Sequence, residues 1–175
     1  MPKGMQAIYS QVVGVNGVGN AAAIFYNIPQ TYTDLKIVVS QRNTSSNVAE
    51  NLAVRFDDAN ALYSHTTLYG SGAGVATSRS SNSAFISYTA GMFINGNNST
   101  ANTYGTFELY IPNYTSNLFK QCLIDAVTEN NATEAYASFT SVLYRNQAPI
   151  RTVYVQGYSA GMANGTTITI YGISR

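Results

Sequence analysis

The sequence predicts an all-β fold: an antiparallel β-sandwich of jelly-roll type, with about eight to ten strands and no substantial helix. Three observations support this expectation. Apolar and polar residues alternate with a period of two in many short segments. Clusters of Asn, Gly, Ser and Pro separate these segments at fairly even spacing. No long segment follows the 3.6-residue period of a helix.

The chain has 175 residues, which suits one domain with its own hydrophobic core. We expect residues 20–175 to form a single β-sandwich domain. We expect residues 1–19 to form an N-terminal arm or a first strand, because they precede the regular alternation. An arm of this kind can pair with a neighbouring subunit by strand addition. Its candidate contact residues are Met5, Ile8, Tyr9, Val12 and Val13.

The strands follow from the alternation, with proline and asparagine marking their ends. The clearest segments are "DLKIVVSQR", "NLAVRFD", "TFELYIP" and "TTITIYGI", in which β-branched and aromatic residues recur at every second position. Pro29 and Pro112 each follow an isoleucine, and proline cannot donate to a strand ladder. The further expected strands, in chain order, are Gln6–Val13, Ala21–Ile28, Leu62–Tyr69, Ser83–Tyr88, Phe119–Val127, Ala135–Tyr144 and Arg151–Gln156.

Two segments of the sequence are compatible with more than one structure. The Ala and Glu residues of "ATEAYASFTSVLYR" allow a helix, but its Thr, Ser, Val and Tyr residues favour a strand. The glycine-rich segment "HTTLYGSGAGVATSRSSN" resembles a phosphate-binding loop. It has no lysine and no following helix, and Val75 or Thr77 stands where the motif G-x-G-x-x-G requires its third glycine. We therefore expect a long, flexible hairpin connection there.

The composition excludes several classes of partner. Charged residues make up 10% of the chain and the net charge is +1, with the cations scattered singly. Nucleic-acid binding needs clustered cations, so neither nucleic acid nor an anionic membrane is expected as a partner. No apolar run is long enough to span a bilayer or to serve as a signal peptide. The single cysteine, Cys122, lies in an apolar segment and is expected to be buried.

No set of residues predicts catalysis or a cofactor. His65 is the only histidine, and no nucleophile motif accompanies it. Asp57 and Asp58 could ligate calcium, but a β-turn explains them as well. Glu129 and Glu134 do not form a recognisable acid pair. We therefore expect no enzyme, no cofactor and no metal.

Tyrosine usage points to binding surfaces. There are fourteen tyrosines and no tryptophan. Exposed tyrosine favours interfaces and sugar stacking, although strand propensity explains its frequency equally well. Among the tyrosines near turns, Tyr104 and Tyr114 are candidate contacts. Arg79, the only charge between Asp58 and Glu108, is expected to find its partner in an interface.

Several segments together resemble a family of small virion proteins of tailed bacteriophages that infect aquatic bacteria, including cyanobacteria. The segments are "IPQTYTDL", "IPNYTS", "TENNAT" and the closing "TTITIYGIS", which span roughly residues 24–173. The resemblance implies a jelly-roll-like structural protein of the virion without catalytic activity. It brings no functional residues with it.

The resemblance leaves two virion roles open. The first is a capsid decoration (cement) protein, expected to be a homotrimer, which binds the major capsid protein on the outside of the shell and stabilises it. The short chain leaves no room for a fibre shaft, and its low charge suits a protein packed against symmetric neighbours. The alternative is a tail-fibre or receptor-binding module that contacts host glycans. Either would be assembled in the host cytoplasm.

Overall fold

The structure is a computed structural model that describes residues 4–15, 21–87, 91–132 and 134–174. The described residues form twelve strands and no helix, so the all-β prediction is confirmed. No described helix has the length and apolar character to cross a bilayer. The strands are β1 (Gly4–Val12), β2 (Ala22–Phe25), β3 (Asp34–Gln41), β4 (Ala49–Phe56), β5 (Tyr63–Gly70), β6 (Val75–Ser83), β7 (Phe93–Asn95), β8 (Gly105–Ile111), β9 (Lys120–Val127), β10 (Ala137–Tyr144), β11 (Val153–Gly157) and β12 (Thr167–Ser174).

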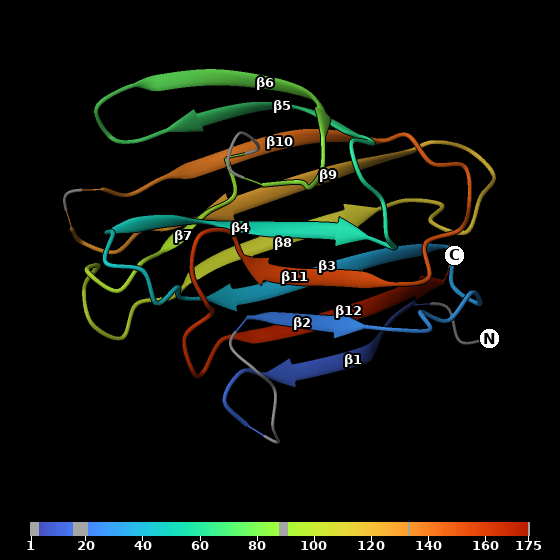
Figure 1. Cartoon of the computed structure of the whole chain (residues 1–175), viewed down its shortest axis with the longest axis horizontal. Helices are drawn as coiled ribbons and strands as arrows, with labels where there is room; N and C mark the ends of the chain where they lie inside the picture. Colours follow the sequence, from blue (N-terminus) through green and yellow to red (C-terminus); the bar gives the residue numbers. More distant parts are fainter. Residues whose placement is uncertain (1–3, 16–20, 88–90, 133, 175) are drawn as a thin grey trace.

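Two antiparallel sheets form a β-sandwich, as the alternation predicted (Figure 1). The larger sheet has eight strands in the order β1-β12-β3-β8-β9-β10-β5-β6, and the smaller has four in the order β2-β11-β4-β7. A jelly roll divides eight strands between two sheets. The eight-and-four division leaves that finer prediction unconfirmed.

The alternation in sequence becomes an inner and an outer face of the larger sheet. Strand β9 shows this most clearly, because its residues are buried and exposed in strict turn. Ile124 faces the smaller sheet, and Asp125 faces solvent. Inner-face residues of both sheets form one hydrophobic core, which includes Ile37, Leu109 and Ile170 from the larger sheet and Phe56 and Val155 from the smaller.

The glycine-rich segment forms a β-hairpin. The prediction of a long flexible connection there is therefore wrong. Residues 75–83 form strand β6, which pairs with β5 along its length. The turn between them is short: the Ser71 N–H donates to the Gly74 carbonyl at 3.1 Å. Strand β6 was missed because its sequence, "VATSRSSNS", carries no alternation. An edge strand that buries neither of its faces needs no alternation of apolar and polar residues.

Other differences concern short or irregular elements. The predicted strand Ser83–Tyr88 is wrong, because the described residues 84–87 do not form a strand. Among them, Ile86 forms an isolated bridge to Val54. Tyr88 lies outside the described residues. Strand β7, with three residues, was not predicted. Residues 137–144 do form a strand, so the choice against a helix is confirmed.

Candidate interaction surface

The outer face of the larger sheet is the most extensive candidate surface, because the smaller sheet packs on the opposite face. Its exposed apolar side chains gather on β5, β6, β9 and β10. We call this set the apolar strip: Leu68, Val75, Leu123, Val127 and Phe139. Most of these residues line a shallow depression of about 470 Å³.

Cross-strand pairing places the strip residues next to one another. Phe139 lies opposite Leu68 on β5 and opposite Asp125 on β9. Ala137 lies opposite Gly70 and Val127, and Gly70 lies opposite Val75. Val75 is 75% exposed. Apolar side chains at this exposure gain free energy when a partner covers them.

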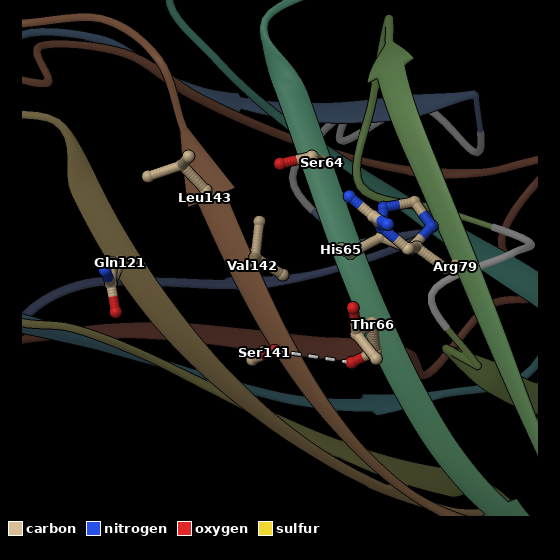
Figure 2. A pocket seen from close by; sticks show the side chains of 8 residues that line it. All are labelled: Ser64, His65, Thr66, Arg79, Gln121, Ser141, Val142 and Leu143. Atoms are coloured by element: carbon tan, nitrogen blue, oxygen red, sulfur yellow. Dashed lines mark hydrogen bonds between the residues drawn. The ribbon is translucent and has the colours of Figure 1, made fainter.

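A polar depression of about 250 Å³ adjoins the strip on the same strands (Figure 2). Thr66 and Ser141 stand on neighbouring strands, and the Ser141 hydroxyl donates to the Thr66 carbonyl at 3.5 Å. Arg79 and Gln121 reach the depression from β6 and β9. These side chains offer donors and acceptors to a polar ligand or partner.

Two carboxylates meet on this face, at the middle of the sheet. Glu108 on β8 lies opposite Asp125 on β9. Glu108 also forms an ion pair with Lys36 on β3 at 2.7 Å. This pairing could not be predicted from the sequence, because 17 positions separate the two carboxylates and only the strand register brings them together.

The predicted contact residues of the N-terminal segment lie on or after β1, at one edge of the larger sheet. Met5 is 58% exposed, and Val12 is 37% exposed. Ile8 and Tyr9 are half-buried. The Tyr9 hydroxyl donates to the Tyr26 carbonyl at 2.9 Å, and its ring packs against Phe25 with centroids 5.8 Å apart. Val13 is fully buried in the core and takes no part in a surface.

The other predicted contacts are dispersed. The Tyr104 hydroxyl donates to the Asn164 carbonyl at 2.7 Å. Tyr114 is fully buried, and its hydroxyl donates to the Pro29 carbonyl, so it offers no contact surface. Arg79 is exposed on β6. Within the described residues its guanidinium forms neither an ion pair nor a hydrogen bond.

Two buried cations, Lys120 and Arg42, were not predicted from the sequence. The Lys120 ammonium donates to the carbonyls of Asn146, Gln147 and Ala148 at 3.1, 3.0 and 2.6 Å. Burial lowers the pKa of Lys120, and the charge of Asp57 partly offsets this shift.

Arg42 organises a loop in a similar way. Its guanidinium donates to four carbonyls, of Asn97, Ser99, Thr100 and Thr103, at 2.8–3.0 Å. Both cations therefore hold loops by bonding backbone carbonyls. The only sequence signal is a lone cation at the end of an apolar strand.

The residues considered for catalysis or metal binding do not converge. Asp57 Oδ1 accepts from the backbone N–H groups of Arg151 and Thr152 at 3.0 Å, so it ties two loops together. Glu129 accepts from the nearby Asn131 N–H. His65 is buried in β5. Within the described ranges, no three His, Cys, Asp or Glu residues are grouped as metal ligands.

Cys122 is buried, as predicted, and it is not bonded to another cysteine. Burial raises the pKa of its thiol to about 12, although the charge of Lys120 acts in the opposite direction. A thiol with this pKa is a poor nucleophile at neutral pH. Its role is to fill space on the inner face of β9.

Comparisons with known proteins leave the family open. No family model matches the chain, and no curated protein matches it. Among solved structures, the galectin LEC-6 of Caenorhabditis elegans is 12% identical, with 87% of this chain and 96% of that chain covered and a TM-score of 0.25.

Two peptidase structures are similar at the same level. SCP-B, a member of the eqolisin family in complex with the tripeptide Ala-Ile-His, is 9% identical, with 87% of this chain and 62% of that chain covered and a TM-score of 0.25. Scytalido-glutamic peptidase is 8% identical, with 87% and 63% covered and a TM-score of 0.24. At these TM-scores we transfer neither a binding activity nor a catalytic activity to this chain.

Proposed function

We propose that this protein is a structural protein of a tailed-bacteriophage virion, and that it acts as a capsid decoration protein. It would bind the major capsid protein on the outside of the shell and stabilise the particle. The proposal gives it no catalytic role. The observation that carries the proposal is the β1 edge of the larger sheet, together with the sequence resemblance described above.

Strand β1 has the properties of a docking edge. It runs for nine residues, "GMQAIYSQV", without a charged residue or a proline. It pairs with β12 on one side, and no described strand pairs with it on the other. Natural edge strands that avoid partners usually carry charges, prolines or bulges. Strand β1 has one bulge, between Ala7 and Tyr9, and its residues Gly4–Ala7 keep a regular register with β12. An uncharged edge instead favours addition of a strand from a partner, with Met5 as an exposed apolar contact.

The mechanism of stabilisation would be mechanical. Each copy would extend its larger sheet by a strand of the capsid shell and thereby join neighbouring capsid subunits. Backbone hydrogen bonds give such a contact affinity, and side chains on alternate faces give it specificity. Self-association into symmetric oligomers, such as the homotrimer expected from the resemblance, would add further links between capsid subunits.

The experiment is a binding assay with capsid shells that lack this protein. Met5→Lys places a charge on the β1 edge and should reduce co-sedimentation with the shells. Leu118→Lys is the matched control, because Leu118 is 68% exposed in the loop before β9 and should leave binding unchanged. Equal binding of both variants and the unaltered protein would reject β1 as the docking edge.

The alternative proposal is a tail-fibre or receptor-binding module that contacts host glycans. The polar depression favours it, because Thr66, Arg79, Gln121 and Ser141 present hydroxyl, guanidinium and amide groups beside the exposed ring of Phe139. Aromatic faces and polar groups together suit saccharides. Titration of the purified protein with host surface polysaccharide tests this proposal. Binding that Phe139→Ala or Arg79→Ala abolishes would support the alternative, and absence of binding would remove it.

A further inference from the structure

We propose that the free edge of β6 binds the β6 strand of a second copy of this chain, in an antiparallel pair centred on Thr77. This contact lies at the opposite border of the larger sheet from β1 (Figure 1). It does not depend on the virion assignment. It would be a two-fold contact, so a homotrimer would need a further interface elsewhere.

The turn of the hairpin fixes which backbone groups of β6 point outward. In an antiparallel pair, each strand directs the N–H and C=O of alternate residues toward its partner. The Ser71–Gly74 hydrogen bond and the register place Ala76, Ser78 and Ser80 in bonding positions toward β5. Val75, Thr77 and Arg79 therefore direct their backbone donors and acceptors away from β5. No described strand covers this side.

The outward groups are self-complementary in one register. With Thr77 on the two-fold axis, Thr77 pairs with Thr77 of the second copy, and Val75 pairs with its Arg79. This arrangement allows up to about six backbone hydrogen bonds. Val75 is the most exposed large apolar residue described, and the aliphatic stem of the opposing arginine would cover it.

The competing registers are worse for physical reasons. Centring the pair on Arg79 would place two guanidinium groups directly opposite each other, and like charges in that position are destabilising. It would also require residues beyond Ser80, where the register with β5 shifts. A register centred on Val75 would pair only a few residues. The regular segment Val75–Ser80 thus fits a second β6 best at Thr77.

The β6 strand of a second copy fits the β6 edge better than it fits the β1 edge. The register of β1 with β12 shifts between Ala7 and Tyr9, so its edge is irregular in the middle. The irregularity of β6 lies at its end. The apolar strip also continues across the proposed contact, since Leu68 lies opposite Thr77 and Phe139 lies opposite Leu68. The two strips would join into one apolar surface.

Cysteine cross-linking of the full chain tests the register. In the proposed pair the Cα atoms of the two Thr77 residues lie about 5.5 Å apart, a separation that a disulfide bridges. Ser81 is an exposed hydroxyl residue on the same strand. Its two copies would lie roughly 27 Å apart. Under mild oxidation, Thr77→Cys should form linked dimers at least about tenfold faster than Ser81→Cys. Cys122 is buried and does not compete.

Removal of one backbone donor tests the same contact without a cross-link. Thr77→Pro deletes an N–H that points away from β5, so it should leave the fold intact and weaken the dimer. Thr77→Ala keeps the N–H and should behave as the unaltered protein. One edge buries less area than a standard interface, so dimers should increase with protein concentration in sedimentation analysis.

These measurements use the purified protein, and their outcome is therefore separate from any result on virions. Equal cross-linking rates of the two cysteine variants would overturn the proposal. A monomer at every concentration would also overturn it, as would a trimer in which Thr77→Cys does not cross-link.

Discussion

Lys120 shows how this chain uses charge inside the fold. It is 2% exposed, and its ammonium group is bonded to three carbonyls of the loop after β10. The ammonium therefore fixes the loop rather than a ligand. A buried charge of this kind is stable only while its hydrogen bonds are made.

Replacement of this lysine should destabilise the protein. Lys120→Met removes the donor from three carbonyls, and we expect the free energy of unfolding to fall by about 1–3 kcal/mol. The control is Lys36→Met, which removes the partly exposed ion pair with Glu108 and should cost about 0–1 kcal/mol. Urea unfolding of both variants makes the comparison. A smaller loss for Lys120→Met than for Lys36→Met would contradict the structural role.

Cys122 gives a prediction about alkaline pH. Burial raises the pKa of its thiol from 9.0 to about 12 in the folded protein. The folded state therefore holds a proton that the unfolded state releases, and stability present below about pH 9 is lost as the pH rises through 12. Tyr144, whose pKa burial also raises to about 12, acts in the same direction.

The test compares how steeply the free energy of unfolding changes with pH in two proteins, and not the free energies themselves. Cys122→Ala removes one of these groups, so its free energy of unfolding should fall less steeply than that of the unaltered protein between pH 9 and 12. Thermal unfolding at a series of pH values measures both slopes. If the slopes coincide, the thiol does not contribute in the way proposed.

At the scale of elements, the β5–β6 hairpin depends on one glycine of its turn. Gly72 has a φ of +77°, which disfavours any side chain, whereas Gly74 does not have a positive φ. A Cβ atom would meet no neighbour at either position. The two glycines therefore differ in backbone conformation and not in available space.

Alanine substitutions separate these effects. Gly72→Ala should destabilise the hairpin by about 1–2 kcal/mol, the cost of a left-handed conformation with a side chain. Gly74→Ala should be neutral or slightly stabilising, because it reduces the freedom of the unfolded chain. Hydrogen exchange of the Ala76 and Ser78 amides reports on the hairpin directly. Equal exchange in the two variants would contradict the turn geometry.

The same elements show what the sequence can predict. Strand β9 was predictable because one of its faces is buried and the other is exposed. Its apolar and polar residues therefore alternate with a period of two. Strand β6 was not predictable, since an edge strand without a covered face can be built from small polar residues. The pairing of Glu108 with Asp125 depends on register between separate strands, which no local pattern encodes.

At the scale of the whole molecule, the low charge has a consequence for the proposed attachment to a capsid shell. Charged residues make up 10% of the chain, and the net charge is +1. Attachment through backbone bonds and apolar contacts should therefore depend little on ionic strength. Co-sedimentation with capsid shells across a salt series measures this dependence. Release of the protein at moderate salt would indicate an ionic contact and would contradict docking through β1.

The larger sheet ends in two borders, β1 and β6, that no described strand covers, and each has its own proposed partner. The β1 border would serve the capsid shell and the β6 border a second copy, so one sheet could link several subunits of a particle. Sequence alternation predicted the sandwich, but it could not show which strands lie at the borders. That depends on strand order, which is set by contacts between distant segments.

The copy number of the protein in purified virions tests the central claim most directly. Quantitative mass spectrometry would measure it relative to the major capsid protein. A decoration protein predicts a fixed ratio to the major capsid protein that is maintained from one preparation to the next. A copy number matching that of tail subunits, or absence of the protein from the particle, would contradict the account.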